Sequence, residues 1–117
     1  MKALIIKEPW IDLILENKKI WEIRGSNTKI RGKIFLIKSG TGQIWGTAEL
    51  VDSFKVSIVD LKRNPLKHRI PIGAVSEIGY KQAYAWEMKN AKLFDKPIPY
   101  KHPKGAVIWV NIDDDFC

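Results

Sequence analysis

Apolar and polar residues follow one another along this chain in patterns that predict short strands and short helices. Four consecutive apolar residues at positions 3–6 are typical of a buried strand. Behind Pro9, apolar residues recur at the spacing of one helix face, which predicts a helix over residues 9–16. Asn17, which tolerates a left-handed backbone, is expected to end this helix.

The rest of the pattern predicts further strands and few helices. Residues 19–24 alternate between apolar and polar positions, so one face of that strand should be buried and the other polar. Ser57 is placed to cap a short helix. Pro97 and Pro99 are expected to interrupt strand pairing, because proline has no N–H to donate. Additional strands are expected over residues 33–38, 44–52, 83–94 and 106–112, and another helical turn over residues 74–78.

This mixture of strands and helices lacks the regular alternation of a parallel α/β protein. It predicts an α+β fold with a mostly antiparallel sheet that can close into a small barrel. The length of 117 residues, with no internal repeat and no linker, indicates a single domain over residues 1–117.

Composition and charge narrow the function classes. The chain has 20 Lys and Arg residues against 13 Asp and Glu residues, a net charge of +7 that favours an anionic partner such as nucleic acid. Cys117 is the one cysteine and there are two His residues, so no disulfide, metal site or cofactor is expected. The sequence has no apolar run of membrane-spanning length and no signal-peptide cleavage site, so we expect a soluble, cytoplasmic protein. The oligomeric state stays open.

Lys19, Glu22 and Arg24 are the strongest candidates for binding or catalysis. On a strand, Glu22 and Arg24 point to the same face, and Lys19 lies at the preceding helix-to-strand junction, where it can swing toward them. A lysine, a carboxylate and an arginine in one groove can bind phosphate, read a base edge or transfer a proton. The alternative is an ordinary surface ion pair, which is common and weak.

Other residues can contribute to a nucleic-acid site. Trp10, which opens the first predicted helix, is the best candidate for stacking on a base. Lys38, Ser39 and Gly40 combine a cation, a hydroxyl and open backbone N–H groups, which suits an anion, although a plain Gly-rich hairpin explains them equally well. Two basic segments suit phosphate contacts or are solvated loops: Lys62, Arg63, Lys67, His68 and Arg69 form one, and Lys101, His102 and Lys104 form the other.

Several segments of the chain resemble the ASCH domain family of the PUA-like superfamily. Residues 17–24 correspond to its G-x-K-x-x-E-x-R signature, with Asn17 in place of Gly, and Asn can make the same left-handed turn. Further similarity is found at Glu8-Pro9-Trp10 and over residues 31–34, 46–50, 84–86, 97–100 and 105–110. The resemblance covers nearly the whole chain and implies a small β-barrel with flanking helices and a cleft lined by the signature.

The same resemblance implies roles for individual residues. ASCH relatives are linked to RNA or other nucleic-acid recognition; one subset deacetylates N4-acetylcytidine nucleosides, and ribonuclease activity is reported for another. Lys19 matches the signature lysine, which is proposed as a catalytic residue in the deacetylating subset. Glu22 stands where that subset has Thr, which counts against this activity, and Glu77 and Glu87 are the candidates for its downstream glutamate. Arg24 matches the signature arginine, an anchor for phosphate or carboxylate or a structural partner of Glu22.

The sequence therefore favours a nucleic-acid-binding domain that recognises RNA, a nucleotide or a nucleoside in a cleft lined by Lys19, Glu22 and Arg24. The alternative is a hydrolase that acts on a modified nucleoside, or a ribonuclease, with Lys19 and Glu22 as catalytic residues in the same cleft. A third hypothesis is a protein-interaction domain whose cleft receives a peptide or an acidic ligand. The sequence does not distinguish RNA from DNA and does not identify the base.

Overall fold

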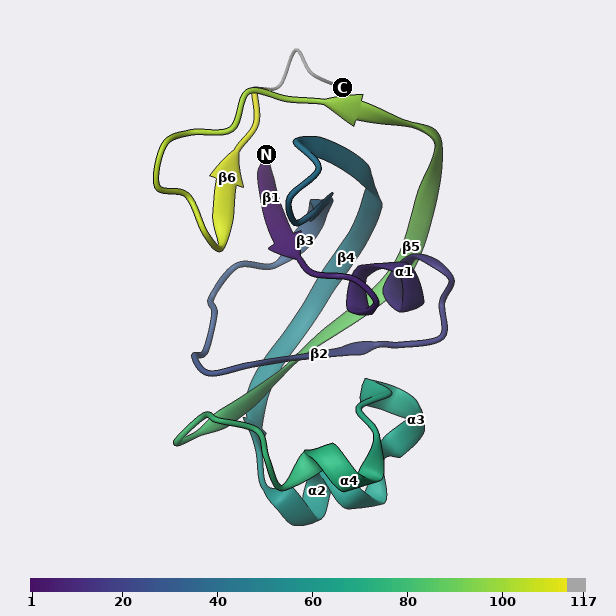
Figure 1. Cartoon of the computed structure of the whole chain (residues 1–117), viewed down its shortest axis with the longest axis vertical. Helices are drawn as coiled ribbons and strands as arrows, with labels where there is room; N and C mark the ends of the chain where they lie inside the picture. The colour runs from purple at the N-terminus through teal and green to yellow at the C-terminus, as the bar shows by residue number, and fades with distance from the viewer. Residues whose placement is uncertain (114–117) are drawn as a thin grey trace.

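Six strands form one sheet within residues 1–113, the part of the chain that the computed structural model describes (Figure 1). Cys117 lies outside the described residues. The α+β class and the mostly antiparallel sheet are confirmed. In chain order the elements are β1 (Lys2–Ile6), α1 (Trp10–Leu15), β2 (Trp21–Arg24), β3 (Gly32–Lys38), β4 (Gln43–Val56), α2 (Ile58–Arg63), α3 (Pro65–His68), α4 (Ile72–Val75), β5 (Ala83–Pro99) and β6 (Trp109–Asn111).

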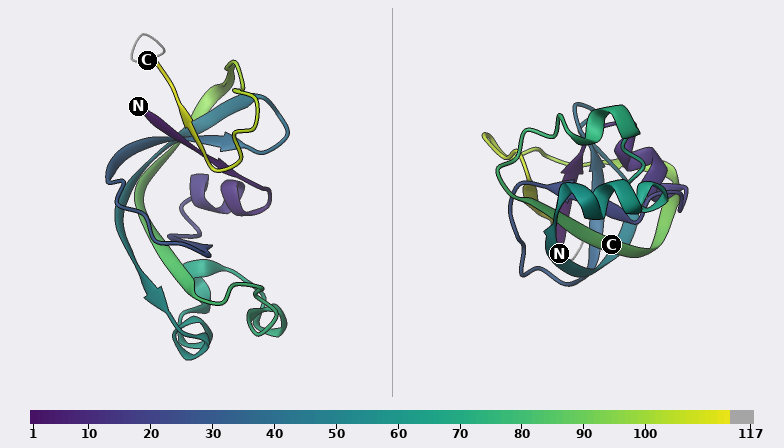
Figure 2. Two further views of the ribbon diagram at one scale, coloured as in Figure 1. Left: turned by 90° about the vertical axis from the view of Figure 1, so that its left-hand side faces the viewer. Right: turned by 90° about the horizontal axis from the view of Figure 1, so that it is seen from below.

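The sheet is curved but open, so the expected closure into a barrel is wrong. The strand order is β2-β5-β4-β3-β1-β6, and only the β1–β3 pair is parallel. The edge strands β2 and β6 have four and three residues and do not pair with each other. Shifts of register along the long β4–β5 pair bend the sheet, because each irregularity adds local twist. The bent sheet wraps around α1 without closing (Figure 2, left).

Strand β5 extends to Pro99, but residues 94–97 have no partner in β4, so the pairing is interrupted at Pro97 as expected. It resumes at Ile98 and Pro99, which lie opposite Ile44 and Gln43. Strand β2 pairs only with residues 84–87 of β5, which leaves β4 as the single partner for the far half of β5. Proline is tolerated on such an edge, because no second neighbour needs its missing N–H. The last strand is shorter than expected, and residues 100–108 form a loop before β6.

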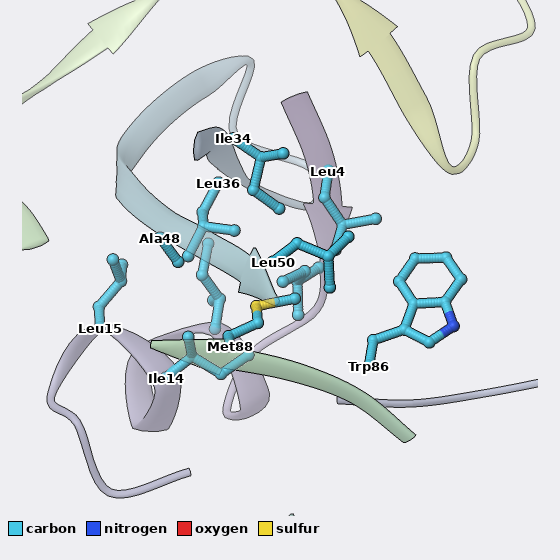
Figure 3. Packing of buried hydrophobic residues seen from close by; sticks show 11 residues of the cluster. Leu4, Ile14, Leu15, Ile34, Leu36, Ala48, Leu50, Trp86 and Met88 are labelled. Atoms are coloured by element: carbon cyan, nitrogen blue, oxygen red, sulfur yellow. The ribbon is translucent and has the colours of Figure 1, made fainter. Parts of the chain in front are cut away.

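The main core lies between the concave face of the sheet and α1 (Figure 3). Ile11 and Ile14 of α1 are buried in the same cluster as aliphatic residues of β1, β3 and β4. Trp86 of β5 closes one side of this core, and its ring stacks on Trp109 of β6 with ring centroids 5.8 Å apart. Helices α2, α3 and α4 gather at one end of the sheet (Figure 1), where a smaller cluster includes Trp21.

Gly46 marks the tightest packing between β4, β5 and α1. A Cβ atom at this position would overlap the carbonyl oxygen of Lys92 and lie 2.6 Å from Cδ2 of Leu15. Because backbone cannot move aside like a flexible side chain, Gly46→Ala is expected to lower the free energy of unfolding by about 2 kcal/mol. Urea denaturation with linear extrapolation measures this change.

Gly73 provides the matched control for that substitution. It lies in α4 and has open space where a Cβ would be added. Gly73→Ala is therefore expected to leave stability unchanged or to raise it by up to about 1 kcal/mol, since Ala is the better helix former. Equal effects of the two substitutions would contradict the close approach at Gly46.

Candidate functional site

A cavity of about 500 Å³ opens beside β2, α1 and the segment that leads from α4 toward β5. Its walls combine charged side chains with the aromatic rings of Trp10 and Tyr80. The polar side chains that line it include Lys7, Lys19, Glu22, Arg24, Ser39 and Glu77. Lys19, Glu22 and Arg24 therefore line one cleft, rather than forming separate pairs in solvent.

Lys19 reaches the cleft because the chain turns sharply after α1. Asn17 adopts the left-handed conformation with a φ of 60°, as the sequence predicted. The backbone N–H of Lys19 then donates to the carbonyl of Leu13, which holds the turn against the helix. The Lys19 side chain is buried, with the whole residue 2% exposed. Its Nζ donates to the carbonyl of His68 over 2.5 Å and lies 4.8 Å from the ring centroid of Trp10.

Burial changes the acid–base behaviour of Lys19. Loss of solvent lowers its pKa from 10.5 to about 8, while the nearby Glu22 carboxylate opposes this shift and Arg24 adds to it. The lysine is thus mainly charged at neutral pH, with a neutral fraction of about one tenth. It can donate hydrogen bonds as a cation or, in its neutral form, accept a proton.

Glu22 and Arg24 form the second part of the cleft. Glu22 is 5% exposed, and its Oε2 accepts a hydrogen bond from Arg24 Nε at 3.0 Å and forms an ion pair with Arg24 Nη2 at 2.9 Å. The same Nη2 also donates to the carbonyl of Ile5 over 2.9 Å, which ties β2 to β1. The Arg24 guanidinium lies 5.5 Å from the ring centroid of Trp86. This side of β2 was expected to be its polar face, but Glu22 is buried and Arg24 only partly exposed.

Each of these three charged groups retains hydrogen-bonding capacity toward a ligand. Within residues 1–113, the Nη1 amino group of Arg24 makes no hydrogen bond. Glu22 Oε1 lies 3.7 Å from Lys19 Nζ, which is beyond hydrogen-bond length although within ion-pair range. Lys19 uses one of its donors on His68. The arrangement therefore offers donors and an acceptor side by side.

Comparison with known proteins assigns the family. The family model described as the ASCH domain matches residues 4–98. This chain belongs to the ASCH domain family. The expected membership of this family is confirmed, and the matched range includes Lys19, Glu22 and Arg24. ASCH domains are PUA-like domains associated with RNA binding.

The fold of this ASCH domain is similar to that of the ASCH protein from Zymomonas mobilis. The crystal structure of that protein has a TM-score of 0.74 and 12% identity over 97% of this chain and 88% of that chain. The crystal structure of a tyrosine-to-phenylalanine variant of that protein has a TM-score of 0.74 and 12% identity over 97% of this chain and 91% of that chain. A serine-to-alanine variant has a TM-score of 0.69 and 14% identity over 97% of this chain and 89% of that chain. No curated protein sequence matches this chain significantly. At such low identities the likeness supports the fold alone.

His68 of the ASCH domain is buried and does not belong to a solvated basic loop, contrary to the expectation. Its Nδ1 accepts from the N–H of Ile70 over 2.9 Å, so its Nε2 carries the proton and donates to the carbonyl of Leu61 over 2.6 Å. Burial, and to a smaller extent the charge of Lys19, lower the pKa of His68. A neutral histidine thus joins α2 to α3 and presents its own carbonyl to Lys19.

The segment Lys38 to Gly40 is divided among different environments. Lys38 Nζ lies 2.8 Å from Asp12 Oδ1 and 3.9 Å from the ring centroid of Trp45, and it does not line the cleft. Ser39 does line the cleft, whereas Gly40 lines a neighbouring hollow. His102 lines that hollow too, while Lys101 and Lys104 are exposed residues outside the walls of both cavities.

Lys7 and Tyr80 of the ASCH domain line the cleft but were missed by the sequence analysis. Lys7 follows β1 and Ser39 follows β3, and these strands run parallel with Ile6 opposite Lys38. Parallel strands end at the same sheet edge, so this pairing, once known, indicates that Lys7 and Ser39 lie together. Of the two candidate downstream glutamates, Glu77 lines the cleft, whereas Glu87 lies opposite Trp21 in the sheet.

Neither a cluster of possible metal ligands nor a membrane-spanning helix is found within residues 1–113. Residues 1–113 contain no group of three or more His, Cys, Asp or Glu side chains that can hold a metal ion. The helices found in this range are too short to cross a bilayer.

Proposed function

We propose that this ASCH domain binds RNA by accepting a nucleoside into the cleft around Lys19, Glu22 and Arg24. The observation that carries the proposal is a cavity of about 500 Å³ whose wall holds these buried or partly buried charges with donors and an acceptor to spare. Cavities of such size accommodate small molecules. Membership of the ASCH domain family supports RNA as the source of the nucleoside.

The roles of the cleft residues follow from their chemistry. The free Nη1 group of Arg24 and the Nζ of Lys19 would donate to carbonyl or phosphate oxygens of the ligand. Glu22 Oε1 would accept from an exocyclic amino group of the base. Trp10 and Tyr80 are the aromatic residues in the wall on which a base could stack.

The net charge of +7 is expected to add an electrostatic contribution to the affinity for RNA, and this contribution does not depend on the base. Basic residues attract the phosphates of RNA and release counterions on binding. We expect the affinity for a short single-stranded RNA to fall about tenfold or more between about 50 mM and 200 mM salt. Fluorescence anisotropy with a labelled oligonucleotide measures this fall. An affinity that stays constant over this range would count against an electrostatic contribution to binding.

A hydrolase remains the second candidate function, because the pKa of Lys19 is lowered to about 8 and Glu77 lines the same cleft. On N4-acetylcytidine, water would attack the acetyl carbonyl and the C–N bond would break, releasing acetate and cytidine. A neutral Lys19 could accept the proton of that water. Assays on N4-acetylcytidine and on RNA, with Lys19→Met as the control, separate turnover from simple binding.

The pH dependence distinguishes the two functions, since they need opposite forms of Lys19. Binding that requires the charged lysine should be constant at neutral pH and weaken as the pH rises through about 8. Hydrolysis with neutral Lys19 as the base should instead become faster over the same rise and then level off. Nucleoside affinity and acetate release, each measured from about pH 6 to 9.5, give the answer. A flat binding profile would show that the charge of Lys19 makes no contribution.

A further inference from the structure

A second hollow of about 380 Å³ adjoins the cleft. The two cavities share the wall formed by Ile5, Lys7, Ser39 and Val107. Beyond that wall, the second hollow is lined by the Gly-rich turn after β3 and by the loop that precedes β6. A ligand that fills the cleft can therefore extend over the shared wall without crossing a solid part of the protein.

The shared wall carries a cation and a hydroxyl without protein partners. Within residues 1–113, neither Lys7 Nζ nor Ser39 Oγ makes a hydrogen bond or an ion pair. Their backbones are fixed, because the N–H of Ser39 donates to the carbonyl of Ile6 over 2.9 Å. None of the residues that line the second hollow is acidic. The boundary between the two hollows is therefore suited to one anionic group.

The far wall of the second hollow presents two rings in a fixed arrangement. Tyr100 Oη donates to Nδ1 of His102 over 2.6 Å, and His102 Nε2 donates to the carbonyl of Ala106 over 2.9 Å. The two ring centroids are 5.7 Å apart in an edge-to-face arrangement. Aromatic and histidine rings held in place in this way are the surfaces on which bases of single-stranded RNA stack.

Building on the proposed function, we propose that the second hollow binds the neighbouring nucleotide of a single-stranded RNA, with the intervening phosphate on Lys7 and Ser39. The cleft would read one base, and the hollow beside Tyr100 and His102 would hold the next by stacking. The recognised ligand is then a dinucleotide unit within a strand, rather than an isolated nucleoside. Each part of the unit has a separate contact, so each can be tested alone.

The test compares the common ribonucleosides, their 3′- and 5′-monophosphates, and the dinucleoside monophosphates built from them, by calorimetry or by competition against labelled RNA. The best dinucleoside monophosphate should bind at least about tenfold more tightly than the best nucleoside, since base stacking and a charged phosphate contact each contribute. His102→Ala should reduce this gain about threefold to tenfold and leave nucleoside affinity unchanged. Lys7→Ala should weaken both the dinucleoside monophosphates and the nucleoside monophosphates.

Lys104→Ala is the matched control. Lys104 lies in the same loop as His102, but it lines neither cavity. The substitution should leave the ratio of dinucleotide to nucleoside affinity as in the wild type. Nucleoside binding with no gain for any dinucleotide would overturn the second subsite while leaving the proposed function intact. A gain that survives both His102→Ala and Lys7→Ala would overturn it as well. Absence of binding by every probe would overturn the subsite and the proposed function together.

Discussion

Replacing Lys19 with Met is expected to reduce the affinity for a nucleoside or a short RNA about 100-fold. The lysine is buried beside Glu22 and lines the cleft, so its loss removes a buried charged donor from the cleft wall. A charge-assisted hydrogen bond in such a site contributes about 1.5–3 kcal/mol. Met fills a similar volume and brings no new charge, so the cavity should keep its shape. Equilibrium titration of the variant and the wild type measures the change.

Lys18→Met is the control that separates the loss of a lysine in the cleft from the loss of one positive charge elsewhere. Lys18 is adjacent in sequence and exposed, and its Nζ lies 3.2 Å from Glu16 at the surface. The substitution removes the same charge and should change affinity less than about threefold. If Lys18→Met weakened binding as much as Lys19→Met, the effect would arise from net charge and not from the cleft.

Arg24→Ala is expected to lower the free energy of unfolding by about 3 kcal/mol. The arginine donates the Nε hydrogen bond to the Glu22 carboxylate, forms an ion pair with it through Nη2, and also donates to the carbonyl of Ile5. Without it, a buried carboxylate keeps only Lys19 at 3.7 Å and loses its hydrogen bond and its closer ion pair. Leaving such a charge unsatisfied costs more than the pair itself contributes. Urea denaturation monitored by tryptophan fluorescence measures the loss.

Two further variants test whether the unsatisfied Glu22 carboxylate causes the loss of stability. Glu22→Gln in the Arg24→Ala background should recover part of the lost stability, because the unsatisfied charge is removed. Lys18→Ala, which breaks an exposed pair with Glu16, should cost less than about 1 kcal/mol. A cost for Arg24→Ala no greater than that of Lys18→Ala would contradict the role of Arg24 as the partner of a buried carboxylate.

Local features of the fold could be predicted from the sequence because their causes are local. Asn17 has the left-handed backbone expected of it. Ser57 caps α2 through a capping box with Asp60, whose pKa is lowered by the hydrogen bonds to Ser57. The open sheet and the pairing of Pro99 could not be predicted, since they depend on how far β2 and β6 extend beside their neighbours.

In the candidate site too, the features with local causes could be predicted from the sequence, and those that depend on the tertiary structure could not. Glu22 and Arg24 share a face because strand periodicity places them there, and this could be seen from the sequence alone. The contribution of Lys7 depends on the parallel pairing of β1 and β3, which the sequence pattern does not reveal. Lys38 was a candidate for the anion site, but Asp12 on α1 holds its ammonium group elsewhere. Such competing partners become visible only in three dimensions.

The central claim is that a nucleoside enters the cleft between Lys19, Arg24 and Trp10. It is tested most directly by titrating ¹⁵N-labelled protein with the ribonucleoside that binds best and following the Arg24 Nε–H and tryptophan indole N–H signals by NMR. We expect saturable shifts of the Arg24 and Trp10 signals with one common dissociation constant, and loss of these shifts in Lys19→Met. Shifts confined to the exposed basic residues of α2 and α3, with the Arg24 and Trp10 signals unchanged, would contradict it.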